Sequence, residues 1–256
     1  MDFSKYRNHQ KFDLNNFMKI KNFLYKLKTD LKGVYNYPSI YTNKTDYELY
    51  WKNKSSELNA FQRDRAKIVE KRIREYSSVV DVASGTGKIL NYLILRKKIK
   101  AKAFDLSKIS LKRHQDLNIE CFSTDLNNSS DLEQLPEANH YLAFEILEHL
   151  QNSEAVLHSL LKKANQSVFV SVPNTGYFTY RLRLMLGRFP VQWRNHPGEH
   201  IRFWTKEDMT WWLKELNLKS QSKLYFYQGI PLLNKMLPGI FAKGILVEIQ
   251  SAMKLQ

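Results

Sequence analysis

Short apolar runs alternate with helical patterns along most of the chain, from about Tyr76 onward. Apolar residues at 89, 90, 93 and 94, for example, recur at helical spacing between two such runs. Strands that alternate with helices are typical of an α/β domain with a mostly parallel sheet. The last two strands are expected to close the sheet as a hairpin-like edge. The predicted strands lie at residues 78–82, 101–104, 119–123, 141–144, 167–172, 224–227 and 245–249.

Two segments fall outside this alternation. Residues 1–75 are helical in pattern, basic and rich in aromatic residues, which predicts an N-terminal extension or cap. Residues 175–204 interrupt the pattern after the fifth strand and are predicted to form a lid over the substrate. The chain therefore divides into an extension at 1–75 and a main domain at 76–256 that contains the lid.

The first predicted helix of the extension has an apolar face and lysines elsewhere. A helix of this kind either packs on its own domain or lies on an anionic membrane surface, here through residues 14–32. The sequence leaves both possibilities open. The apolar face carries Leu14, Phe17, Ile20, Phe23, Leu24, Leu27 and Leu31.

An acidic residue stands at or just beyond the carboxyl end of four successive predicted strands, namely Asp81, Asp105, Asp125 and Glu145. In open α/β sheets, ligands bind outside the carboxyl ends of the strands. The pattern therefore places a binding site at this edge of the predicted sheet.

The first strand runs into a glycine turn, residues 83–87, that precedes a helix. Glycines let the backbone approach a ligand at a helix N-terminus. Asp105 ends the next strand, where one carboxylate can accept hydrogen bonds from both ribose hydroxyls of a nucleoside. Leu90 occupies the third glycine position of the dinucleotide fingerprint, and no Gly-Lys-Ser/Thr follows, which disfavours a pyrophosphate. A nucleoside with a charged amino-acid tail fits better, held by Asp81 and the loop amides.

These segments resemble the motifs of class I S-adenosylmethionine-dependent methyltransferases. Motif I reads acid-x-Gly-x-Gly-x-Gly; Asp81, Gly85 and Gly87 match it, and Ala83 replaces the first glycine. The extra methyl group is expected to tighten or reshape the methionine pocket. Residues 103–107, 124–126 and 144–150 resemble the second, third and fourth motifs in order, and the likeness covers about residues 60–250.

The resemblance implies a Rossmann-like fold: a seven-stranded, mostly parallel sheet with helices on both faces, and S-adenosyl-L-methionine as cofactor. In such enzymes the second-motif acid holds the ribose, and the third-motif acid faces the adenine amino group. An arginine of the entry helix, here at 65, meets the cofactor carboxylate. The residues expected to bind the cofactor are Arg65, Asp81, Ala83, Gly85, Gly87, Asp105, Leu106, Asp125, Leu126, Phe144 and Glu145.

More narrowly, residues 171–177, 181–188 and 196–205 resemble the MetW-like branch of these enzymes. The Glu-x-Leu-Glu-His segment at 145–149 is similar to that of ubiquinone O-methyltransferases. Members of the MetW-like branch are often associated with methionine or cell-surface polysaccharide metabolism. The resemblance implies methyl transfer to a small-molecule or glycan acceptor, with a hydroxyl as the expected nucleophile.

A hydroxyl nucleophile benefits from a base that removes its proton. His149 is the first candidate, with His196 and His200 of the lid as further ones, and the alternative is a histidine that only bonds to backbone. The spacing of Glu145, Glu148 and His149 also suits a divalent ion if the backbone is helical there. The same pattern is common in enzymes without a metal, so the sequence assigns none.

Aromatic and arginine residues gather in the lid and just beyond it. Arginine binds carboxylate and phosphate at two points, and aromatic faces stack on sugars, which suggests an anionic or glycosyl substrate. The alternative is a solvated basic loop in which the tryptophans are packing anchors. The residues predicted to contact substrate are Tyr177, Arg181, Trp193 and Arg202.

Composition narrows these possibilities only a little. The 256 residues are 43% hydrophobic, enough for a folded core. The net charge of +15 favours an anionic partner without naming it. The single Cys121 excludes an intramolecular disulfide, and the sequence shows neither a membrane span nor a signal sequence, so a cytoplasmic location is expected, with the inner membrane face as a peripheral option.

Two other functions stay open. The basic charge favours RNA methylation, but no RNA-binding module is evident in the sequence, so a nucleic-acid partner is not expected. A non-catalytic regulatory or partner subunit of the MetW type would retain the same cofactor fold, because fold does not fix activity.

Overall fold

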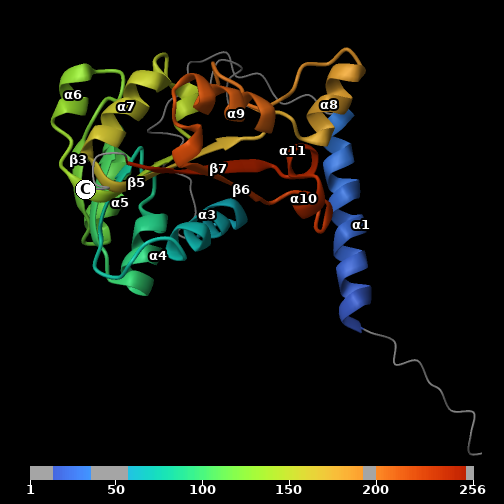
Figure 1. The fold of residues 1–256 in the computed structure, drawn as a ribbon. Helices are drawn as coiled ribbons and strands as arrows, with labels where there is room; N and C mark the ends of the chain where they lie inside the picture. The colour runs from blue at the N-terminus through green and yellow to red at the C-terminus, as the bar shows by residue number, and fades with distance from the viewer. Residues whose placement is uncertain (1–13, 36–56, 193–199, 252–256) are drawn as a thin grey trace, which may run out of the picture.

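The computed structural model describes residues 14–35, 57–192 and 200–251, which Figure 1 shows. Within them, one seven-stranded sheet has the order β3-β2-β1-β4-β5-β7-β6. Strands β1 to β5 pair in parallel, and β7 runs antiparallel to both β5 and β6. The predicted Rossmann-like fold class is confirmed. The strands are β1 Ser78–Val82, β2 Lys100–Asp105, β3 Glu120–Ser123, β4 Ala138–Phe144, β5 Ala164–Pro173, β6 Ser222–Tyr227 and β7 Gly244–Gln250.

The two late strands pair antiparallel as predicted, but they do not form a hairpin-like edge. β7 lies inside the sheet, between β5 and β6, and only β6 stands at that edge. All but the last residue of β7 are buried, whereas β6 is mostly half-buried. The connection between them is too long for a tight turn and contains two short helices, α10 Leu233–Met236 and α11 Pro238–Phe241.

Helices cover both faces of the sheet (Figure 1). α3 and α4 lie on one side, and α7 and α9 lie on the other. Side-chain caps begin several of them: Asn59 and Thr205 form capping boxes at α3 and α9, and Ser107 caps α5. The helices of the body are α3 Ala60–Glu70, α4 Lys88–Lys97, α5 Lys108–Asp116, α6 Ser129–Glu133, α7 Ser153–Lys163, α8 Phe178–Met185 and α9 Lys206–Glu215.

Two apolar clusters flank the sheet because strand side chains alternate between its faces. In β1, Val80 and Val82 join the cluster beneath α7 and α9. Val79 points the other way, into the cluster of α3 and α4. A sheet buried on both faces is rigid, and its carboxyl edge is therefore a firm support for a site.

The N-terminal helix α1, Leu14–Tyr35, stands at the side of the body and packs against α8 (Figure 1). Its Asp30 accepts hydrogen bonds from Lys243 Nζ at 2.5 Å and from Tyr177 OH at 2.6 Å. Arg183 of α8 is buried and donates to the carbonyl of Val34 at 2.8 Å. The carboxyl half of α1 is thus anchored by polar contacts.

The apolar face predicted for this helix is largely not packed on the body. Ile20 and Leu24 are 59% and 56% exposed, whereas Phe23 and Leu27 are half-buried. The side chains of Leu14 and Phe17 lie outside the described residues. Among the described helices, none combines the length and apolar character needed to cross a bilayer.

Candidate active site

The turn between β1 and α4 is built from left-handed backbone. Ala83, Gly85 and Gly87 have φ values of 60°, 60° and 70°. A Cβ on Gly87 would lie only 2.8 Å from Cδ2 of His114. Position 87 therefore needs glycine both for its backbone and for its packing. Ala83 adopts a conformation that glycine would adopt with less strain.

Asp105 holds this turn from the end of β2. Its Oδ2 accepts from the Gly85 N–H at 2.8 Å, and its Oδ1 accepts from the Ser107 N–H at 2.9 Å. The residue is 7% exposed, and burial raises the pKa of its carboxyl while the two N–H groups act to lower it. Each oxygen has a further lone pair. Asp105 therefore fixes the glycine turn and retains acceptor capacity at the carboxyl edge.

The neighbouring acids of this edge have different surroundings. Asp81 is 3% exposed, and burial together with the charge of Asp105 raises the pKa of its carboxyl well above the usual range. Asp125, beyond β3, accepts from the backbone N–H of Asn127 at 2.9 Å and so caps its own turn. The strand ends bring Asp81 and Asp105 into electrostatic contact, while Asp125 lies on a local turn.

A buried arginine joins α3 to the end of β4. Arg65 Nη1 lies 2.8 Å from Glu145 Oε1, and it also donates to Ser171 Oγ and Tyr227 OH at 3.4 Å each. Burial acts to lower the pKa of Arg65, but Tyr227 and Glu145 raise it further, so the guanidinium stays charged. Glu145 has a φ of 52°, uncommon for a residue with a side chain. The ion pair thus accompanies a strained backbone position directly after β4.

Beyond Glu145 the chain makes a 3-10 turn, η2 Leu147–His149. The N–H of Ile201 donates to the Glu148 carbonyl at 2.9 Å and holds the end of the lid segment against this turn. The rings of His149 and His200 meet edge to face, with centroids 4.7 Å apart. The structure therefore brings together two of the three histidines that the sequence proposes as catalytic.

Comparison with known proteins decides the family. The sequence profile of MetW, described as methionine biosynthesis protein MetW, matches residues 63–247. This chain belongs to the MetW family. A search of curated protein sequences gave no match.

Several solved structures share the fold of this MetW-family protein. The N-terminal domain of EvdMO1, solved in the presence of SAH and D-fucose, aligns with a TM-score of 0.53 and 10% identity, over 89% of this chain and 97% of that one. The methyltransferase domain of bacterial CtHen1-C aligns with a TM-score of 0.51 and 19% identity, over 75% and 98% of the two chains. Magnesium protoporphyrin IX methyltransferase ChlM from Synechocystis PCC 6803 aligns with a TM-score of 0.51 and 11% identity, over 92% and 100%. These likenesses agree with the methyltransferase class and cofactor that the sequence predicts.

The predicted substrate residues of the MetW-family protein are occupied by contacts within the chain where the structure describes them. Tyr177 is buried and bonds to Asp30, and Arg202 pairs with Glu154 at 2.5 Å. Arg181 is exposed, with its Nε bonded to the Gly176 carbonyl at 2.7 Å. Their assignment to substrate stays a prediction. Trp193 and His196 lie outside the described residues.

The apolar residues assigned to the cofactor divide into two kinds. Leu106 is 58% exposed beside Asp105, where a ligand ring can pack on it. Leu126 is 7% exposed and belongs to the apolar core, so it supports the edge from below. Phe144 is buried with the guanidinium of Arg65 5.6 Å from its ring centroid.

Sequence reasoning missed four residues that shape the site. Ser171 and Tyr227 bond to Glu145, His114 packs beneath Gly87, and Asp30 ties α1 to Tyr177. Ser171 ends its run of hydrogen bonds on a strand that was predicted, but nothing local marks it as polar support. The other three contacts join distant segments, so only the fold reveals them.

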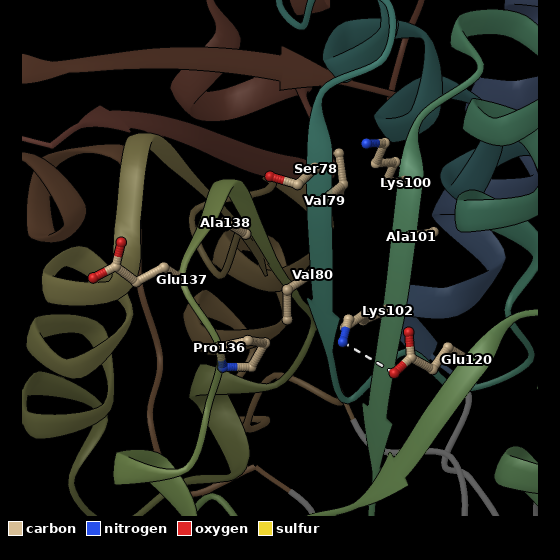
Figure 2. Close-up of a pocket in the computed structure, with 10 residues that line it drawn as sticks. All are labelled: Ser78, Val79, Val80, Lys100, Ala101, Lys102, Glu120, Pro136, Glu137 and Ala138. Carbon is tan, nitrogen blue, oxygen red and sulfur yellow. Dashed lines mark hydrogen bonds and ion pairs between the residues drawn. The ribbon is translucent and has the colours of Figure 1, made fainter.

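A shallow cavity of about 330 Å³ lies elsewhere, around the amino-terminal halves of the parallel strands (Figure 2). Ser78 and Lys100 begin β1 and β2, and Lys102 pairs with Glu120 at 3.0 Å across its wall. In parallel α/β sheets, ligands bind at the opposite, carboxyl ends of the strands. The candidate site therefore lies at the glycine turn and η2 rather than in this cavity.

Proposed function

We propose that this protein transfers the methyl group of S-adenosylmethionine to a hydroxyl group of a small-molecule or glycan acceptor. One observation carries the proposal: a glycine turn braced by the buried Asp105 shares the carboxyl edge of the sheet with the His149–His200 pair. The first feature suits a nucleoside, and the second suits removal of a proton from an acceptor.

The residues of the glycine turn fit this cofactor. The hydroxyls of Ser84 and Thr86 are buried and have no hydrogen-bond partner in the described part of the chain. Buried polar groups are normally bonded, so the turn has donors and acceptors to offer a ligand. Asp105 is suited to the ribose hydroxyls, and Leu106 to the face of the adenine. The sulfonium of the bound cofactor supplies an electrophilic methyl group.

The chain's own residues have two tasks in such a reaction. The first is alignment, because displacement at a methyl carbon needs the acceptor oxygen in line with the departing sulfur. The Arg65–Glu145 ion pair fixes the end of β4 for this purpose. The second task is to draw off the hydroxyl proton, and the imidazoles of His149 and His200 are placed for it at η2.

An anionic or glycosyl acceptor is supported by charge and by a structural relative. The chain has a net charge of +15, and Arg181 is exposed on α8 beside the lid. EvdMO1, whose N-terminal domain has a similar fold, was crystallised in the presence of D-fucose. An arginine and a sugar-binding relative both favour a glycan with carboxylate or phosphate groups.

The test is binding followed by transfer. Calorimetry on the cofactor-stripped protein is expected to show one bound S-adenosylhomocysteine, and labelled S-adenosylmethionine is expected to methylate a member of a panel of acidic and neutral glycans. His149→Ala should lower kcat without changing cofactor affinity, whereas His158→Ala, on the exposed face of α7, should leave both unchanged. Absence of cofactor binding contradicts the proposal. Binding without transfer to any acceptor favours a non-catalytic partner subunit.

We also propose that α1 brings the enzyme to an anionic membrane surface. Its exposed Ile20 and Leu24 lie among the exposed lysines 21, 28 and 32, and Met185 of the adjoining α8 is 82% exposed. Apolar insertion combined with lysines is the pattern of interfacial helices. This surface is the part of the molecule that a lipid-linked acceptor would approach.

Vesicle co-sedimentation tests this recruitment. The intact protein should sediment with phosphatidylglycerol vesicles and much less with phosphatidylcholine vesicles. Ile20→Ser combined with Leu24→Ser should release it, whereas Leu95→Ser, at a residue 74% exposed on α4, should not. Equal binding by both variants, or none by the intact chain, removes the idea.

A further inference from the structure

Glu148 is a buried carboxylate with nothing to bond. It is 1% exposed, and neither of its oxygens has a hydrogen-bond partner in the part of the chain that the structure describes. Burial of an unsatisfied polar group costs about 2–7 kcal/mol. The nearby cation, Arg65, makes its ion pair with Glu145 instead. A buried acid in these surroundings is therefore expected to have a ligand.

Two imidazoles stand beside this carboxylate. Ligand atoms of Glu148, His149 and His200 all lie within 4.8 Å of one another. Bonds of about 2.0–2.2 Å to a zinc ion bring ligand atoms to within about 4 Å of each other, so small side-chain rotations complete such a site. The backbone bond from Ile201 N–H to the Glu148 carbonyl holds the two contributing segments together.

We propose that Glu148, His149 and His200 bind one divalent transition-metal ion, with Zn²⁺ as the representative case. Two imidazoles and one carboxylate form the ligand set of catalytic zinc sites that leave a coordination position open. The set differs from the sequence-based candidate, Glu145 with Glu148 and His149. Glu145 is committed to Arg65, Ser171 and Tyr227, and His200 from the lid takes its place.

The position of the ion gives it a role that rests on the proposed methyl transfer. An acceptor hydroxyl bound at the open position loses its proton to water more readily, because the ion stabilises the alkoxide. The alkoxide oxygen then forms a bond to the methyl carbon. The carbon–sulfur bond breaks with its electron pair going to sulfur, which leaves neutral S-adenosylhomocysteine. His149 and His200 would act as ligands in this step rather than as free bases.

Metal binding can be measured without any acceptor. The untagged full-length protein, stripped with a chelator, is titrated with Zn²⁺ alone by calorimetry and with Co²⁺ alone by visible absorption. We expect one ion per chain and a Co²⁺ spectrum of low coordination number. His200→Ala and Glu148→Gln should each weaken binding by more than about 100-fold, beyond the effect known for outer-shell partners. The matched controls are His158→Ala, at an exposed histidine, and Glu145→Gln, both of which should retain binding.

The outcomes separate this site from the proposed function. Absence of Zn²⁺ binding, unchanged affinity in His200→Ala, or equal losses in Glu145→Gln and Glu148→Gln would overturn the metal site. If Glu148→Gln fails to fold, His200→Ala decides, because His200 lies on a loop. S-adenosylhomocysteine binding, measured on the same samples, should survive His200→Ala. Loss of zinc with cofactor binding intact contradicts only this inference, and zinc binding without cofactor binding contradicts only the proposed function.

Discussion

The two halves of the candidate site are assembled in opposite ways. In the nucleoside half, Asp105 braces Gly85, 20 residues away, and the contact joins two neighbouring strand ends. In the acceptor half, Arg65 reaches Glu145 and Tyr227, the latter 162 residues away, and His200 reaches η2 from the far end of the lid. The first half is local in the chain, and the second exists only in the finished fold.

This difference separates a common task from a particular one. A glycine turn followed by an acid on the next strand suits any nucleoside of this type, whatever the acceptor. The acceptor half depends on α3, β6 and the lid, which are free to change with the substrate because loops tolerate variation. The nucleoside half should therefore respond to single local substitutions, and the acceptor half to the breaking of long-range pairs.

The largest expected effect is the loss of cofactor affinity in Asp105→Asn. The amide cannot accept from the turn and from both ribose hydroxyls, and hydrogen bonds to a charged group contribute about 1.5–3 kcal/mol. Calorimetry with S-adenosylhomocysteine should show a loss of about 100-fold. Asp116→Asn, an equal charge change on the exposed side of α5, should have no effect. Similar affinities in the two variants would show that Asp105 serves only the turn.

The second effect tests the long-range half through stability. Arg65→Met leaves Glu145 without its cation, and because Glu145 is about one third exposed we expect a loss of about 2 kcal/mol in the free energy of unfolding. Adding Glu145→Gln should restore part of it, as measured by urea unfolding in a double-mutant cycle. The exposed Arg96–Glu70 pair is the control, since Arg96→Met should cost less than about 1 kcal/mol. Additive losses for Arg65 and Glu145 would deny that the pair is coupled.

The same contrast explains what the sequence can reveal. The strands, Ser107 as a helix cap and the acids at the strand ends follow from periodicity and capping rules, so they were predictable. β7 entered the sheet between β5 and β6 because it is buried on both faces, which pattern alone does not distinguish from an edge strand. The replacement of Glu145 by His200 in the metal cluster required knowing that Arg65 had already taken Glu145.

A smaller effect concerns the one departure from motif I. Ala83 has a φ of 60°, where a side chain strains the backbone, so Ala83→Gly should raise the free energy of unfolding by about 0.5–1 kcal/mol. Ala101→Gly, within the regular strand β2, should instead lower it by a similar amount. Urea unfolding of both variants measures the two signs. A loss of stability in Ala83→Gly would mean that the methyl group makes contacts worth more than the strain.

The smallest effect is absent at neutral pH and appears in acid. His114 packs beneath Gly87 and is fully buried; its Nδ1 bonds to the Ser110 carbonyl at 2.8 Å, while its Nε2 has no partner in the described part of the chain. Burial lowers the pKa of His114 below its ordinary value, so its stabilising contribution is complete above about pH 6.5 and is lost as the pH falls from there towards the folded-state pKa. Relative to His114→Gln, the wild type should lose free energy of unfolding between pH 7.5 and 5.5, whereas His158→Gln should show no such difference because His158 is exposed. Because the ring lies under the glycine turn, cofactor affinity should fall over the same range while the Arg65–Glu145 coupling does not change. A parallel loss in both would mean that the two halves of the site are not independent.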